Sequence, residues 1–122
     1  MTNILLTGAS RGLGLGLARH YLKQGRRLFH LGRSACPLSS DRLTQQLVDL
    51  AQLEAIPAAL QALDPRDLDL VILNAGVLGE IRDLADTPMA DARRLMDINL
   101  WANKAIVDWL VRQRRLPRQL VF

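Results

Sequence analysis

Apolar residues in the first third of the chain alternate between short runs and helical spacing. Ile4–Leu6 is a short apolar run typical of a buried strand, and Arg27–Leu31 alternates well enough to form a second strand. Between them, apolar side chains four residues apart predict a helix over Gly12–Gln24, with Gly25 as its C-cap. Strand, helix and strand in this order predict a βαβ unit with a right-handed crossover.

The same alternation continues through the rest of the chain. Gln46–Leu50 and Leu68–Leu73 are expected strands, and the second is rich in branched aliphatic residues, as in strands buried on both faces. Ala51–Leu63 is expected to be a helix that is kinked or begins late at Pro57. Gln119–Phe122 begins a further strand. Strands that alternate with helices indicate an α/β fold with a mostly parallel sheet.

A long helix is expected before that last strand. Thr87 is a candidate N-cap and Pro88 suits the first helical position, and the helix should run to about Arg114. One broad apolar face supports it, made of Leu95, Ile98, Ala102, Ala105, Ile106 and Trp109. The segments 35–44, 64–67 and 77–86 are expected to be loops or turns.

Glycines gather where the first expected strand meets the first expected helix. Gly8, Gly12 and Gly14 form a Gly-x-x-x-Gly-x-Gly pattern directly after Thr7. A tight turn here leaves backbone N–H groups free at the positive end of a helix, which suits a phosphate or pyrophosphate. On this stretch alone, a surface loop that merely contains three glycines is the alternative.

The distribution of charge points to the same end of the chain. The formal net charge of the 122 residues is +4, and no acidic residue occurs before Asp41. A basic surface at this end favours an anionic ligand. Nucleic acid is the rival partner, but aromatic residues make up only 4% of the chain, too few for a base-stacking surface. Arg19, Lys23, Arg26 and Arg27 are explained as a solvated helix face.

Other side chains offer little chemistry of their own. Cys36 is the single cysteine, so no internal disulfide is possible, and a reducing cytoplasm is expected. His20 and His30 lack a metal-ligand pattern and are expected on a surface and in a strand, without a metal site. The sequence contains no uninterrupted run of about 18 apolar residues, so no membrane-spanning helix is expected.

Four motifs in order give the chain a family resemblance. The glycine turn is followed by Asp49 in the third expected strand, by Asn74-Ala75-Gly76 after the fourth, and by Asp97-Ile98-Asn99-Leu100 in the long helix. This series resembles the first half of a short-chain dehydrogenase/reductase. The resemblance implies one NAD(P)-binding domain over residues 1–122. Its fold is an incomplete, doubly wound Rossmann sheet with strand order 3-2-1-4-5.

The resemblance also implies roles for individual residues. The turn would wrap the pyrophosphate and the adenosine ribose through Thr7, Gly8, Ser10, Arg11, Gly12, Leu13 and Gly14. Asp49 and the backbone of Leu50 would contact adenine, and Asn74, Ala75 and Gly76 would shape the strand end against the cofactor. Asn99 matches the helix asparagine of the Asn-Ser-Tyr-Lys tetrad, which bends its helix and holds a water molecule of the proton relay. We expect Asn99 to be buried and therefore to require a polar partner.

The type of residue at the end of the second expected strand indicates whether NAD or NADP binds. An acidic residue there hydrogen-bonds the ribose hydroxyls of NAD, whereas a basic one suits the 2′-phosphate of NADP. The position offers Arg33 and Ser34, without a carboxylate before Asp41. We therefore expect NADP(H) to be preferred over NAD(H), with Arg33 and Arg11 on the 2′-phosphate.

The catalytic serine and Tyr-x-x-x-Lys of the family are not in this sequence. Tyr21 is no substitute, because Lys23 follows it by two residues instead of four. Two readings follow. In the first, the chain is part of a longer oxidoreductase that acts on a carbonyl or alcohol, and it is inactive alone. In the second, it is a non-catalytic dinucleotide-binding module or a proteolytic fragment that lacks activity. A third, an unrelated methyltransferase or nucleic-acid binder, does not explain the later motifs. Family members often pair through the long helix, so a homo-oligomer is expected.

Overall fold

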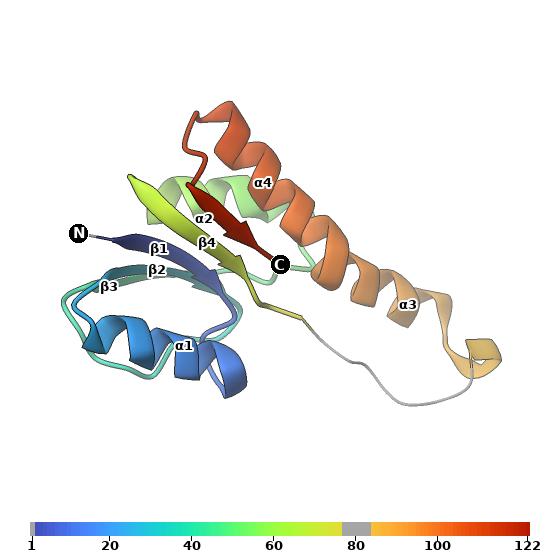
Figure 1. Ribbon diagram of the computed structural model, residues 1–122. Helices are drawn as coiled ribbons and strands as arrows, with labels where there is room; N and C mark the ends of the chain where they lie inside the picture. Colours follow the sequence, from blue (N-terminus) through green and yellow to red (C-terminus); the bar gives the residue numbers. More distant parts are fainter. Residues whose placement is uncertain (1, 77–83) are drawn as a thin grey trace.

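Five parallel strands form one sheet in the computed structural model, which describes residues 2–76 and 84–122. The strands are β1 (Asn3–Thr7), β2 (Arg27–Gly32), β3 (Leu43–Leu47), β4 (Leu68–Leu73) and β5 (Gln119–Val121). Their order is β3-β2-β1-β4-β5, and every neighbouring pair is parallel (Figure 1). The predicted Rossmann-type sheet and its strand order are confirmed.

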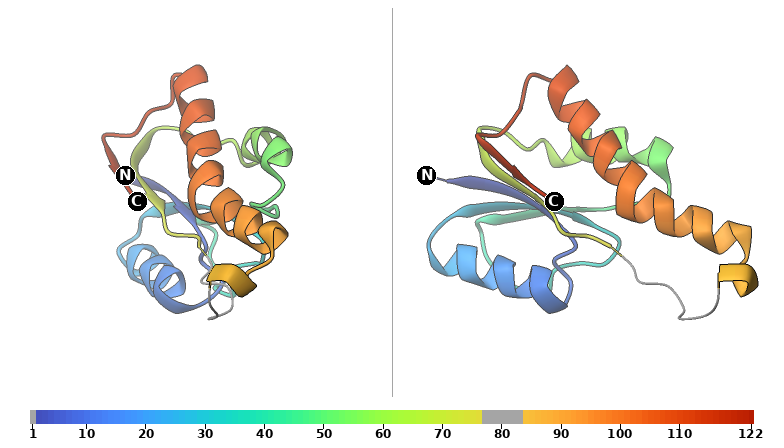
Figure 2. Two further views of the ribbon diagram at one scale, coloured as in Figure 1. Left: turned by 90° about the vertical axis from the view of Figure 1, so that its right-hand side faces the viewer. Right: turned by 45° about the vertical axis from the view of Figure 1, so that its right-hand side comes forward.

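Helices cover both faces of this sheet. The helix α1 (Gly12–Lys23) lies on one face, and α2 (Ile56–Leu63) and α4 (Ala102–Arg112) lie on the other (Figure 1). Figure 2 shows α3 (Met89–Met96) continuing the line of α4 past the carboxyl edge of the sheet. Among the described residues, no helix is long and apolar enough to cross a membrane.

Strand alternation divides the core into two layers. Successive side chains of a strand point to opposite faces. Ile4 and Leu6 of β1 therefore pack with the cluster under α1, whereas Leu5 packs with the cluster that includes Ile106 and Trp109 of α4. These three β1 side chains are fully buried, because both sheet faces are covered. Burial on both faces explains why β1 is a continuous apolar run in the sequence instead of an alternating pattern.

The third strand lies earlier in the chain than the sequence pattern predicts. We expected Gln46–Leu50, but β3 is Leu43–Leu47, with His30 of β2 paired to Gln45. As an edge strand, β3 is half-exposed and mixes polar and apolar residues, so its hydrophobic pattern is weak. Asp49 therefore follows the strand instead of lying within it.

The helices differ from expectation mainly at their boundaries. A 3₁₀ turn at Leu53–Ala55 precedes α2, which places Pro57 in the first turn and confirms the late start. Pro88, not Thr87, occupies the N-cap of α3, since the helix begins at Met89. The expected long helix is broken by a π-helical turn at Asp97–Trp101, and α4 then ends at Arg112.

The expected loops are partly visible. Residues 35–40 lack regular structure, and the segment 64–67 reverses the chain, with Asp64 and Asp67 at φ values of 51° and 52°. Of the expected loop Val77–Asp86, the residues 77–83 lie outside the described part of the chain. The remaining residues, Leu84–Asp86, form a 3₁₀ turn.

Candidate functional site

The turn between β1 and α1 is built around two left-handed glycines. Gly8 has φ +75° and Gly12 has φ +58°, values that side chains with a Cβ rarely adopt. Arg11 is the N-cap of α1, yet its side chain makes no capping hydrogen bond, and the first helical turn contains no acidic residue. The N–H groups of the first helical turn of α1 are thus left without a capping side chain, which is the arrangement that favours an anion.

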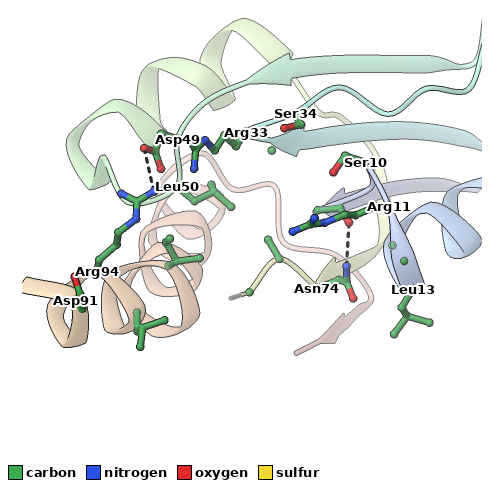
Figure 3. A pocket seen from close by; sticks show the side chains of 18 of the residues that line it. Ser10, Arg11, Leu13, Arg33, Ser34, Asp49, Leu50, Asn74, Asp91 and Arg94 are labelled. Carbon is green, nitrogen blue, oxygen red and sulfur yellow. Dashed lines mark hydrogen bonds and ion pairs between the residues drawn. The ribbon is translucent and has the colours of Figure 1, made fainter. Parts of the chain in front are cut away.

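The end of β4 packs tightly against this turn. A Cβ on Gly14 would collide with the carbonyl oxygen of Gly8, and one on Gly8 would lie 2.9 Å from Cα of Ala75. Asn74 Nδ2 donates a hydrogen bond to the Gly8 carbonyl oxygen at 3.1 Å (Figure 3). Thr7 Oγ1 accepts a hydrogen bond from the Ala75 amide at 3.0 Å. The glycine turn and the Asn-Ala-Gly segment therefore form one packed unit.

A groove of about 880 Å³ opens at the carboxyl edge of the sheet, beside this unit. It lies near the point where the strand order reverses, which is where open α/β sheets bind ligands. All of the predicted site residues except Thr7 and Asn99 line it: Gly8, Ser10, Arg11, Gly12, Leu13, Gly14, Arg33, Ser34, Asp49, Leu50, Asn74, Ala75 and Gly76. Its volume is within the range of about 300–1,000 Å³ that is typical of small-molecule pockets.

Two predicted site residues lie outside the groove lining. Thr7 is fully buried beneath the turn, where it supports Ala75. Asn99 lies in the π-helical turn, and its Oδ1 is 3.1 Å from the place where a Cβ on Gly76 would stand. The expected helix irregularity at Asn99 is present, but its expected burial is wrong. The side chain is exposed, because the side of this turn that carries it and Leu100 is uncovered in the described structure.

One end of the groove is basic. Arg33 and Ser34 follow β2 directly and are exposed, and Arg11 extends from the glycine turn on the neighbouring strand (Figure 3). Figure 3 shows Arg33 on the side of the groove where Asp49 and Leu50 also lie. Two guanidinium groups on adjacent strand ends provide charge and several donors for a phosphate.

The wall of the groove that α3 contributes was not predicted from the sequence. Six further residues line the groove: Gly32, Thr87, Asp91, Arg94, Leu95 and Ile98. The residues from Thr87 to Ile98 in this set are spaced mostly three or four positions apart. Residues with this spacing share one face of a helix, so the spacing could have predicted this wall of the groove. Arg94 Nη2 lies 3.6 Å from Asp49 Oδ2, which connects α3 to the segment after β3. Asp49 Oδ1 accepts a hydrogen bond from the Ala51 amide at 3.0 Å.

Metal-ligating side chains do not gather at this groove. Within residues 2–76 and 84–122, no group of three or more His, Cys, Asp or Glu side chains is placed to hold a metal ion. His20 is exposed on α1 and His30 is buried in β2, the two environments expected from the sequence.

Comparison with known proteins agrees with the fold and the motifs. The family model for short chain dehydrogenases matches residues 2–113. An uncharacterized oxidoreductase of Mycobacterium tuberculosis is 36% identical over 111 residues, which cover 86% of this chain and 42% of that protein. The crystal structure of a short-chain dehydrogenase/reductase from Burkholderia vietnamiensis is 29% identical with a TM-score of 0.83. That match covers 98% of this chain and 60% of the Burkholderia chain.

A second solved structure carries a nucleotide. A short-chain dehydrogenase/reductase from Burkholderia multivorans with bound NADP is 29% identical, with a TM-score of 0.75, over 90% of this chain and 52% of that one. The fold defines a Rossmann-type α/β domain with its groove at the carboxyl edge. The chain belongs to the short-chain dehydrogenase family of oxidoreductases. It spans less than half the length of the Mycobacterium relative.

Proposed function

We propose that this chain is the NADP(H)-binding part of an oxidoreductase that reduces a carbonyl group or oxidises an alcohol. The observation that carries this proposal is the groove, which joins a glycine turn and a free helix N-terminus to two arginines at the ends of β1 and β2. A nicotinamide nucleotide, when bound, supplies or accepts the hydride.

The groove offers a distinct set of groups to each part of the nucleotide. The N–H groups of Gly12, Leu13 and Gly14 at the start of α1 suit the pyrophosphate, since no side chain caps them. The open space around Gly12, where a Cβ would meet nothing within 4 Å, leaves room for a ligand against the backbone. Asp49 and Leu50 suit adenine on the other side of the groove.

Arg33 and Arg11 support the choice of NADP(H). Both line the groove, and no acidic residue precedes Asp41 to hydrogen-bond the ribose hydroxyls of NAD. A 2′-phosphate would gain charge-assisted hydrogen bonds from these guanidinium groups. The NADP in the Burkholderia multivorans structure is consistent with this choice.

Hydride transfer requires more than this chain provides. The serine and the Tyr-x-x-x-Lys of the family are not among its 122 residues, so we propose that the chain alone binds nucleotide without turnover. Within the whole protein, Asn99 would hold a water molecule of the proton relay, next to Gly76 at the end of the groove. A nucleotide-binding module without activity is the second candidate, and NADPH binding without turnover by the full-length protein would favour it.

Two further properties belong to the same proposal. We expect a cytoplasmic location, since Cys36 is a buried free thiol in a chain without another cysteine. We also expect a homo-oligomer, which light scattering over a range of concentrations tests. A constant monomer mass would contradict this expectation.

Replacing Arg33 tests the cofactor preference directly. Arg33→Asp should weaken NADPH binding by at least about tenfold and leave NADH binding equal or tighter, because a charge-assisted contact contributes about 1.5–3 kcal/mol. Arg19→Asp is the matched control: it makes the same charge change on α1, exposed and outside the groove lining. If the ratio of the NADPH and NADH dissociation constants changes equally in both variants, Arg33 does not select the cofactor.

A further inference from the structure

His30 lies at the centre of a buried polar network beneath the groove. Its side chain is fully buried in β2. The Ala9 amide donates a hydrogen bond to His30 Nε2 at 3.0 Å, and His30 Nδ1 lies 2.9 Å from Gln45 Oε1. Gln45 also bonds the backbone of Cys36 twice: Oε1 accepts from the amide at 2.9 Å, and Nε2 donates to the carbonyl at 3.3 Å.

These partners define the protonation of His30. A backbone amide can only donate, so Nε2 must carry a lone pair, and Nδ1 then carries the hydrogen and donates to Gln45 Oε1. A second proton would face the Ala9 N–H at Nε2 and break that bond. The network is therefore complete only when the imidazole is neutral. Burial lowers the pKa of His30, and the hydrogen bond to Gln45 opposes that shift.

The network connects two segments that carry the basic end of the groove. Ala9 immediately precedes Ser10 and Arg11 in the glycine turn, and Cys36 lies two residues after Ser34. Gly32 leaves space for the ring, because a Cβ there would lie 2.8 Å from His30 Nε2. The loop after β2 has no regular secondary structure through residue 40, so the side chain of Gln45 anchors a segment that a strand ladder does not hold.

We infer that His30 is a positioning residue that sets the glycine turn against the Arg33–Ser34 segment, and so fixes the spacing of the groups that receive the 2′-phosphoadenosine end of the nucleotide. This inference rests on the proposed NADP(H) binding. An apolar side chain would fill the same core position at lower desolvation cost, as Leu28 does two residues earlier on the same strand. The imidazole instead holds the amide of Ala9, which no apolar side chain can do.

Within residues 2–76 and 84–122, His30 has no ion-pair partner. Neither β1 nor β3 carries a titratable side chain. The titratable side chains of α1, the glycine turn and the loop after β2 are Arg11, Arg19, His20, Tyr21, Lys23, Arg33, Cys36, Asp41 and Arg42. In the described structure, none of these side chains is hydrogen-bonded to the imidazole. The protonation of His30 is therefore governed by its burial and by its hydrogen bonds to Ala9 and Gln45.

The test uses adenosine 2′,5′-bisphosphate, which probes the adenosine end alone, with the full-length protein. His30→Leu removes the acceptor for Ala9, and Leu28→Val is the matched control on the same buried face of β2. At a temperature where circular dichroism shows both variants folded, His30→Leu should weaken binding by roughly tenfold, the effect of one lost hydrogen bond in a positioned site. Leu28→Val should change the dissociation constant by less than about twofold.

A second variant and a pH profile keep the test decisive. Gln45→Met, at a half-buried position, should weaken binding in the same direction even if His30→Leu does not fold. The wild-type protein should keep its affinity at about pH 7.5 and lose it as the pH falls below about 6.5 toward the lowered pKa of His30, more steeply than His30→Gln, which cannot take up the proton. Equal binding by wild type, Gln45→Met and His30→Gln across the whole pH profile would overturn the inference. Failure of the wild type to bind either NADPH or the bisphosphate would instead overturn the proposed function.

Discussion

Arg94 of α3 and Asp49 after β3 form an ion pair at the groove, with 3.6 Å between Nη2 and Oδ2 (Figure 3). The Ala51 amide holds the other carboxylate oxygen at 3.0 Å. A carboxylate has about four lone-pair sites, so these two partners leave Asp49 with acceptor capacity toward the groove. Arg94 thus orients the carboxylate that we propose for adenine, and it joins α3 to the sheet edge.

Removing this ion pair should affect binding more than stability. Arg94→Gln should raise the dissociation constant of NADPH by about two- to fivefold, because Asp49 loses one of the two contacts that orient it. The free energy of unfolding should change by less than about 1 kcal/mol, since both side chains are partly exposed. Titration calorimetry and urea unfolding measure the two effects.

Arg93→Gln is the control for that variant. Arg93 is exposed on the same helix and does not line the groove, so this change removes the same charge without touching Asp49. Equal loss of NADPH affinity in the two variants would mean that Arg94 acts only through the overall charge.

Two glycines of α1 should respond in opposite directions to alanine. Gly14→Ala places a Cβ against the Gly8 carbonyl oxygen and the Asn74 side chain, so we expect a loss of about 2 kcal/mol or more in unfolding free energy. NADPH binding should also fall, because the turn must move. Gly16 is exposed with open space around it, and Gly16→Ala should stabilise the helix by about 0.5–1 kcal/mol.

Chemical unfolding of both variants measures these changes. A Gly14→Ala protein as stable as the wild type would show that the end of β4 does not pack against the turn as described.

Stability should depend on pH through His30. Its folded-state pKa is lowered by burial below the ordinary value of about 6.5, so the unfolded chain binds the proton more readily. The stability contributed by the neutral ring is present above about pH 6.5 and is lost as the pH falls toward the folded pKa.

Urea unfolding of the wild type and His30→Gln measures this linkage. The stability advantage of the wild type should shrink between about pH 7.5 and 5.5. A constant difference between wild type and His30→Gln at both pH values would contradict the assigned protonation.

The parts of the fold that were predictable from sequence are those with strong local signals. Leu68–Leu73 was predicted with the bounds that β4 has, because burial on both faces leaves an uninterrupted aliphatic run. The glycine turn was equally visible, since its left-handed φ values require glycine. The edge strand β3 was misplaced, because its half-exposed residues carry no clean alternation.

The features that sequence analysis missed depend on contacts far apart in the chain. Arg94 meets Asp49 only after α3 returns to the carboxyl edge of the sheet. His30 was recognised as a strand residue, but its hydrogen bonds to Ala9 and Gln45 arise from the parallel pairing of three strands. Asn99 was expected to be buried, yet its exposure depends on what covers the π-helical turn, which local pattern does not encode.

The most direct test of the central claim is calorimetric titration of the full-length wild-type protein with NADPH and with NADH under identical buffer and salt. We predict that NADPH binds at least about tenfold more tightly, a difference of about 1.4 kcal/mol or more. Equal affinity for the two nucleotides, tighter NADH binding, or binding of neither would contradict the assignment of this groove to NADP(H).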